Sequence, residues 1–146
     1  MSAIRLEQIA GNDADLKAAL TDAHLPTDDI EDHGRTFFKA LTSDGRIIGF
    51  SGVERCGNDF LLRSVVVLPD HRGQSLGDAL VEQTLAGLDP NGDIFLATTS
   101  AAPFFTRIGF SEVQRDSVPA AVLATRQLSC ICPSSATIMK HIKPPT

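Results

Sequence analysis

The sequence predicts one α/β (α+β) domain over residues 1–146, in which about four helices flank a mixed, mostly antiparallel sheet of about six or seven strands. Its 146 residues suit a single domain with its own core. Hydrophobic residues make up 42% of the chain and charged residues 21%, which is typical of a globular protein. A strand–helix–strand order over residues 60–99 adds one right-handed parallel crossover to the antiparallel pattern.

Hydrophobic periodicity assigns the elements of the first half. Strands are expected over residues 3–9, over 35–55 as a hairpin around the turn Ser-Asp-Gly, and over 60–67 before Pro69. A helix is expected over residues 12–25, ended by Pro26, because Leu16, Ala19, Leu20 and Ala23 recur at helical spacing. The acidic stretch 25–34 is expected to add one short helical turn capped by Thr27 or Asp28.

The second half begins with the clearest helix, over residues 75–88. Its apolar face is expected to hold Leu76, Ala79, Leu80, Thr84 and Leu88. The nearly all-apolar run 93–99 is typical of a strand that is covered on both faces. Further elements are expected as a short helix over 100–108 ended by Gly109, a helix over 117–128 and a strand over 135–142.

Composition limits the function classes. The net charge of −5 argues against a general nucleic-acid or anionic-membrane binder. No apolar run approaches the roughly 18 residues of a membrane span, and no secretory signal is seen, so a cytoplasmic protein is expected. The three cysteines, Cys56, Cys130 and Cys132, suggest reduced thiols. No metal site is expected, because no further His or Cys completes Cys130 and Cys132.

The segment RGQSLG (72–77) joins a predicted strand to the 75–88 helix. Free N–H groups at a helix start suit a phosphate, and Gly73 and Gly77 would let it approach the backbone. Ser75 and Asp78 equally form a capping box. The local pattern therefore leaves open an anion site or a capped helix start.

Wider context favours the anion site. The stretch SVVVLPDHRGQSLGDALVEQTL resembles the cofactor motif of the GNAT superfamily of N-acetyltransferases, with Arg72 and Gly77 in place and Ser75 instead of a glycine. Further along, APFFTRIGF resembles the second signature of that family. The last third, with CPSSATIM, is similar to the N-acetyltransferase domain of N-acetylglutamate synthases and, more closely, to the N-acetyltransferases associated with arsenic resistance.

The resemblance implies a GNAT-like domain with its β-α-β crossover at an acetyl-CoA site. The backbone of Val65 to Val67 would polarise the thioester carbonyl, with Val67 in a catalytic role. The residues implied to bind the cofactor are Val65, Val66, Val67, Arg72, Gly73, Gln74, Ser75, Leu76, Gly77, Asp78, Phe104 and Phe105. The Asp78 carboxylate is expected to point away from the pyrophosphate.

A substrate amine must lose a proton before it attacks the thioester, and Glu54 is the first candidate base. The alternatives are a solvated strand-edge role for Glu54, and His33 as the base. Phe105 stands where the family often has a tyrosine that protonates the leaving thiolate. Thr99, Ser100 or water would replace it, and a thiolate with a conjugate-acid pKa of about 8.5 leaves with little help.

The acceptor is expected to be a small amine with an anionic group, such as an amino acid or a glutamate-like analogue. Ser135 matches a substrate-binding serine of the glutamate-synthase branch, whereas Pro133 replaces its arginine. Arg63 or Arg126 would supply the missing cation, or both are surface arginines.

The leading hypothesis is an acetyl-CoA-dependent N-acetyltransferase. A catalytically degenerate CoA-binding sensor or interaction module is the alternative, and a metalloid-binding regulator that uses Cys130 and Cys132 is a third. No nucleic-acid or membrane partner is expected, and a homodimer is left open.

Overall fold

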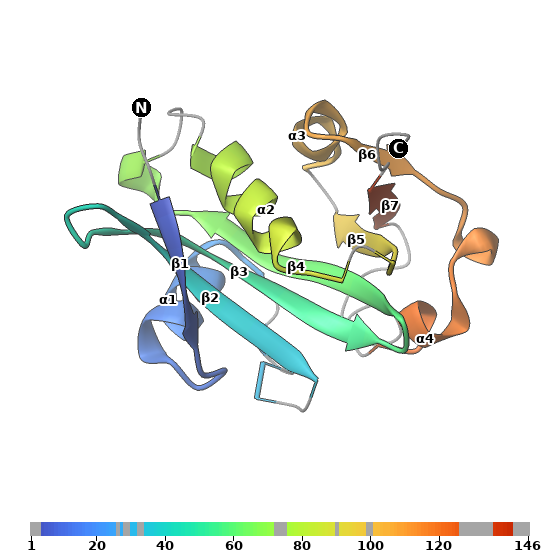
Figure 1. Ribbon diagram of the computed structural model, residues 1–146, viewed down its shortest axis with the longest axis horizontal. Helices are drawn as coiled ribbons and strands as arrows, with labels where there is room; N and C mark the ends of the chain where they lie inside the picture. Colours follow the sequence, from blue (N-terminus) through green and yellow to red (C-terminus); the bar gives the residue numbers. More distant parts are fainter. Residues whose placement is uncertain are drawn as a thin grey trace. The chain divides into compact units, whose positions relative to one another are not determined.

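The computed structural model describes residues 4–25, 27, 30–31, 34–71, 76–89, 91–98, 101–125 and 136–141. In that part of the chain, seven strands and four α-helices follow one another (Figure 1). They are β1 Ile4–Ile9, α1 Ala14–Asp22, β2 Arg35–Thr42, β3 Ile47–Cys56, β4 Asp59–Val67, α2 Leu76–Ala86, β5 Ile94–Thr98, α3 Ala102–Arg107, β6 Phe110–Glu112, α4 Ala120–Leu123 and β7 Thr137–His141. None of the helices in these ranges is long and apolar enough to cross a membrane.

Hydrogen bonds join the strands of the described residues in the order β1-β2-β3-β4-β5-β7-β6. The β4–β5 pair is parallel, whereas β1–β2, β2–β3, β5–β7 and β6–β7 are antiparallel. The predicted mixed sheet with a crossover through α2 is therefore confirmed. The structure adds β6, whose three residues are too few to show a periodicity.

The helix expected over residues 117–128 is shorter than predicted. Pro119 precedes it, and it ends at Leu123. The amide and the hydroxyl of Thr125 both donate to the carbonyl of Val122, at 3.2 and 2.8 Å. Such a local bond offers the backbone an alternative to continuing the helix.

Contacts group the chain into two compact units. The first holds Met1–Glu54 and Leu62–Asp89, and the second holds Arg55–Leu61 and Pro90–Thr146. The strands β3 and β4 contribute to both units. A single domain over residues 1–146 stays a prediction.

In the first unit, α1 and α2 cover opposite faces of the strands (Figure 1). On the α1 face, the predicted core residues Leu16, Ala19 and Leu20 are buried together with Phe37, Phe50 and Val66. On the α2 face, Leu76 and Leu80 are buried with Ile4, Ala40 and Ile48. Burial of one such Leu, Ile or Phe side chain contributes about 1.5–3 kcal/mol.

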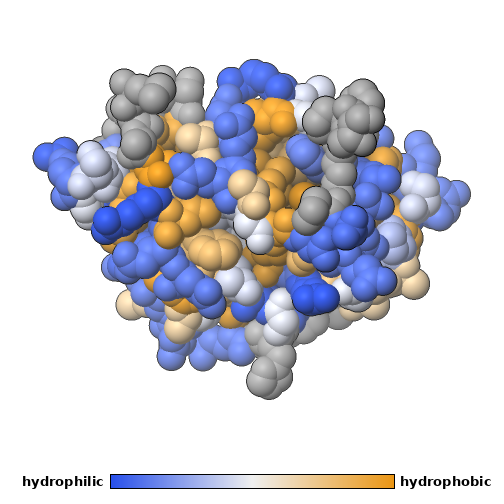
Figure 2. All heavy atoms as spheres, in the orientation of Figure 1, coloured by the Kyte–Doolittle hydropathy of each residue, from blue (hydrophilic) through white to orange (hydrophobic). Residues whose placement is uncertain are grey.

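The buried face of α2 differs from the prediction in part. Leu76, Leu80 and Thr84 are buried as expected, and Val81 is buried as well. Ala79 and Leu88 are half-exposed, because Ala79 lies at the edge of the cluster and Leu88 follows the last helical residue. Val65 and Val67 are partly buried against the same cluster. Figure 2 shows apolar side chains among hydrophilic ones on the face where α2 lies.

The β2–β3 hairpin turns at the predicted Ser43-Asp44-Gly45 segment. Gly45 has a φ of +87°, which a glycine adopts at little cost. The Thr42 hydroxyl donates to the Asp44 carboxylate, and this bond lowers the pKa of Asp44 below its ordinary value. The turn is therefore held by local hydrogen bonds.

The hairpin contains a β-bulge close to this turn. Leu41 pairs with Ile47 but Ala40 pairs with Gly49, so Ile48 is an extra residue in β3. Residues i and i+2 of a regular strand share one face. Here Ile48 packs on the α2 face and Phe50 on the α1 face. The bulge thus decides which β3 side chains face α1.

The second unit has its own apolar core. Ile94, Phe95 and Leu96 of β5 are all buried, as expected for a strand covered on both faces. A buried cluster is formed by β3, β4, β5, α4, β7 and the residue Val118 shortly before α4. Its members are Cys56, Leu61, Phe95, Val118, Val122 and Ile138. Phe105 of α3 lies edge-on to Phe104 and Phe110, with ring centroids 5.0 and 5.7 Å away.

A buried hydrogen bond joins β3 to α2 in the first unit. The hydroxyls of Ser51 and Thr84 are 2.7 Å apart, and the Thr84 hydroxyl also lies 2.7 Å from the Leu80 carbonyl. Because Thr84 uses its hydrogen on that carbonyl, Ser51 donates to Thr84. Thr84→Val therefore leaves a buried Ser51 hydroxyl without this acceptor.

We expect Thr84→Val to lower the free energy of unfolding by about 1–3 kcal/mol and Ser51→Ala by about 1 kcal/mol. The double variant should lose less than the sum, because it leaves no stranded hydroxyl at the contact. Urea unfolding of the four proteins measures the coupling. Strictly additive losses would contradict the bond.

Candidate functional site

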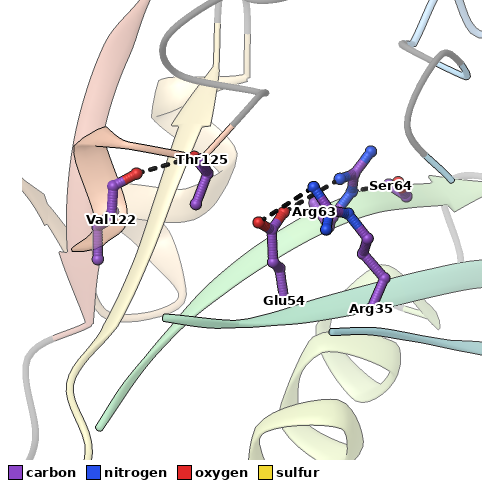
Figure 3. Close-up of polar contacts among 6 residues, drawn as sticks. All are labelled: Arg35, Glu54, Arg63, Ser64, Val122 and Thr125. Atoms are coloured by element: carbon purple, nitrogen blue, oxygen red, sulfur yellow. Dashed lines mark hydrogen bonds and ion pairs between the residues drawn. The ribbon is translucent and has the colours of Figure 1, made fainter. Parts of the chain in front are cut away.

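Three charged side chains meet inside the first unit, on neighbouring strands (Figure 3). Glu54 of β3 lies between Arg35 of β2 and Arg63 of β4. Its Oε1 accepts a hydrogen bond from Nη1 of Arg63 at 3.3 Å, and its Oε2 lies 3.3 Å from Nη2 of Arg35. The exposed fractions of the side chains are 0% for Arg63, 6% for Glu54 and 9% for Arg35. We call these three residues the charge cluster.

Two irregularities of the strands bring the cluster together. With the pairing found at Leu41 and Ile47, Arg35 would face Val53, but the bulge at Ile48 places it opposite Glu54. Ser64, directly after Arg63, has a φ of +58°. Arg63 lies over Phe37 on the α1 face, whereas Val65 packs on the α2 face. The left-handed Ser64 thus breaks the alternation of β4.

The Arg63 guanidinium is held from several sides. Its Cζ lies 5.7 Å from the centre of the Phe37 ring, within the range of a cation–π contact. Its Nε donates to the Ser64 hydroxyl at 3.3 Å. Phe37 in turn covers Gly52, where a Cβ would come within 2.7 Å of the ring. A glycine at position 52 is therefore needed for the ring that supports Arg63.

The electrostatics of the cluster constrain Glu54. Two guanidinium groups beside a carboxylate favour its ionised form. Moving each charge out of water costs several kilocalories per mole, which good pairing offsets in part. Glu54 and Arg63 are both buried, so neither the solvated strand-edge alternative for Glu54 nor the surface alternative for Arg63 holds.

The residues predicted to bind the cofactor lie partly in the first unit. Val65, Val66 and Val67 end β4, beyond the Phe60 and Leu61 pairs with β5. Leu76 begins α2, with Gly77 and Asp78 in its first turn. The Leu76 side chain belongs to the core, so its backbone is the part that a ligand would contact. Arg72, Gly73, Gln74 and Ser75 lie outside the described residues.

The other predicted site residues belong to the second unit or are not described. Phe104 and Phe105 lie on α3, and the Arg107 guanidinium lies 5.4 Å from the centre of the Phe104 ring. The remaining residues that the sequence analysis discussed lie outside the described ranges: His33, Thr99, Ser100, Arg126, Cys130, Cys132, Pro133 and Ser135. Within the described ranges, no group of three or more His, Cys, Asp or Glu side chains could hold a metal ion.

Arg35 was missed from the sequence. It stands at the start of the predicted hairpin, whose sequence gives no signal for the bulge. Regular pairing from the turn would set Arg35 opposite Val53 and turn Glu54 to the other face of the sheet. Nothing in the sequence predicts the positive φ of Ser64, because serine rarely adopts this conformation inside a strand.

Comparisons with known proteins agree with this architecture. Residues 33–112 match the family described as the acetyltransferase (GNAT) domain. A mycothiol acetyltransferase from Nocardiopsis dassonvillei is 39% identical over 59 residues, which are 40% of this chain and 18% of that protein. The chain thus matches less than a fifth of the length of this curated relative.

Solved structures share the fold. GCN5 of Tetrahymena is 14% identical, with a TM-score of 0.71 over 97% of this chain and 98% of that one. N-acetylglutamate synthase from Neisseria gonorrhoeae, complexed with coenzyme A and N-acetyl-glutamate, is 13% identical, with a TM-score of 0.70 over 97% and 35%. A GNAT-family acetyltransferase from Staphylococcus aureus is 19% identical, with a TM-score of 0.64 over 95% and 98%.

Two substitutions of Ser64 test its left-handed conformation. Ser64→Gly and Ser64→Ala both remove the hydroxyl that accepts from Arg63, but Ala keeps a Cβ in the left-handed region. We expect the Gly variant to be more stable than the Ala variant by about 1 kcal/mol in urea unfolding. An Ala variant as stable as the Gly variant would contradict the positive φ.

Proposed function

Because the chain belongs to the acetyltransferase (GNAT) domain family, we propose that it transfers the acetyl group of acetyl-CoA to the amine of a small molecule. The family match over residues 33–112 carries the proposal, since it spans the charge cluster and the β4–α2–β5 crossover. The acetyltransferase relative and the synthase of similar fold are named for small molecules, mycothiol and N-acetylglutamate. An amino acid or a glutamate-like analogue is the acceptor class proposed.

In this proposal acetyl-CoA, the co-substrate, lies against the end of β4 and the start of α2. The backbone of Val65 to Val67 holds the pantetheine arm and polarises the thioester carbonyl. The N–H groups from Gly73 to Asp78 hold the pyrophosphate, with Arg72 adding a positive charge.

The reaction needs one proton removed and one thiolate released. The neutral amine attacks the carbonyl carbon, the C–N bond forms, and the C–S bond breaks as CoA leaves. Phe105 has no proton to give, so water protonates the thiolate, whose conjugate acid has a pKa of about 8.5. Glu54 stays the predicted base, although it would have to accept the proton while paired with two guanidinium groups.

A thiol-release assay tests the proposed activity. We expect CoA to appear when acetyl-CoA is mixed with the protein and an amino-acid panel that includes glutamate and its phosphorus- and arsenic-containing analogues. Mass spectrometry should find the N-acetylated acceptor in equal amount. Tight CoA binding without turnover on the whole panel would instead favour the alternative of a CoA-binding sensor. That alternative is motivated by Phe105, which cannot donate a proton, and by the Asp78 carboxylate.

The base assignment has its own test. If Glu54 removes the amine proton, Glu54→Gln should lower kcat by about 100-fold or more at pH 7. Its remaining rate should rise with pH as more amine becomes neutral. The measurement is kcat against pH, with thermal unfolding of each variant as the check on folding. Near-normal kcat at pH 7 would remove Glu54 from the mechanism as a base.

A further inference from the structure

We infer that Gly49 of β3 is a positioning residue for the acetyl-CoA thioester. It turns the peptide between Val66 and Val67 so that the Val67 N–H points away from β3. The inference rests on the proposed acetyltransfer, in which the backbone of Val65 to Val67 polarises the thioester carbonyl. It adds a residue of the neighbouring strand to that site.

Gly49 lies against the backbone of β4. A Cβ at position 49 would overlap the Val66 carbonyl oxygen, while the carbonyl carbon and the Val67 Cα would lie 3.2 Å away. Any other residue would therefore displace one of the two strands, and a glycine inside a strand is typical of such a close backbone approach. Because its oxygen is nearer than its carbon, the Val66 carbonyl points toward Gly49.

The planar peptide bond carries this direction to the next residue. In a trans peptide the C=O and the N–H point in opposite directions, and the described residues include no cis peptide bond. A Val66 carbonyl that points toward β3 therefore sets the Val67 N–H away from β3. The N–H and C=O of one residue in an extended strand share a side, so the Val66 N–H points toward β3.

Other contacts hold the same segment of β4. The Leu68 amide donates at 2.7 Å to the carbonyl of Ile48, the bulge residue directly before Gly49. The Val66 side chain is buried on the α1 face, and the Val67 side chain packs on the α2 face. β-Bulges occur often next to active sites, where they redirect the chain. Here the bulged part of β3 and the two cores together fix the end of β4.

Gly11 supplies a matched control in the same unit. A Cβ at position 11 would overlap the Ile30 carbonyl oxygen, so Gly11→Ala introduces the same kind of clash with a backbone carbonyl. Ile30 is buried in the core on the α1 face and has no part in the proposed cofactor site. Gly11→Ala therefore reports the loss of stability that such a clash causes by itself.

Kinetics test the role of Gly49. Gly49→Ala should lower kcat by about 10–100-fold, because a misplaced donor no longer stabilises the developing oxyanion. The acceptor is the one found in the thiol-release assay. Calorimetric binding of CoA, which lacks the acetyl carbonyl, should change much less than kcat. Gly11→Ala should keep the wild-type kcat below the unfolding temperature of each variant, measured by thermal unfolding.

The direction of the peptide can be observed in the wild-type protein. Val-Val bonds occur in the sequence only at 65–66 and 66–67. Valine that is isotope-labelled at the carbonyl carbon and at the amide nitrogen therefore gives carbonyl-correlated amide signals from Val66 and Val67 alone. We expect the Val67 signal to shift more with acetyl-CoA than with CoA, and the Val66 signal to respond equally to both. Gly49→Ala should lose this difference, and Gly11→Ala should keep it.

A Val67 signal that responds equally to acetyl-CoA and CoA would overturn the inference. A folded Gly49→Ala variant with the wild-type kcat, or an equal loss of kcat in Gly11→Ala, would overturn it as well. The proposed function survives all three results as long as the wild type transfers the acetyl group.

If Gly49→Ala does not fold, the wild-type signals decide: a difference confined to Val67 supports the inference, and its absence overturns it. If acetyl-CoA binds but no acceptor is turned over, the proposed transfer fails, and the signals of the wild type and both variants decide the positioning role. A wild type that does not bind acetyl-CoA refutes the proposed function and the inference together.

Discussion

The register between β2 and β3 is the constraint on which the charge cluster depends. One extra residue, Ile48, shifts the pairing so that Arg35 lies opposite Glu54 rather than Val53. The same shift sends Ile48 into the core under α2 and Phe50 into the core under α1. Register in a sheet is fixed by the side chains that must be buried. The apolar residues buried on the two faces of the sheet therefore fix the register that places Arg35 opposite Glu54.

A second irregularity acts in the same way on β4. The left-handed Ser64 lets Arg63 lie on the α1 face while Val65 and Val67 pack on the α2 face. Non-glycine residues reach this conformation at a cost of order 1–3 kcal/mol, and such strain often marks functional positions. In β4 the left-handed Ser64 lies between Arg63, which belongs to the charge cluster, and the valines of the proposed thioester site.

The chemistry that follows from this arrangement is one of positioning. Acetyltransfer from a thioester needs a neutral amine near a polarised carbonyl, and a thiolate leaves with little help. An oxyanion-stabilising backbone at the end of β4 would supply part of that. Because a thiolate is a good leaving group, a phenylalanine in place of a phenol at position 105 is compatible with the reaction.

The sequence by itself determined the order of the elements, the crossover through α2, the hairpin turn and the family, because these follow from local periodicity and short motifs. It also singled out Glu54 as a base and Arg63 as a substrate-binding cation, but not as partners of one another. The tertiary structure decided that they form one buried cluster with Arg35. A bulge and a positive φ depend on which side chains the two cores must bury. That demand acts between residues far apart in the chain, so no short stretch of sequence records it.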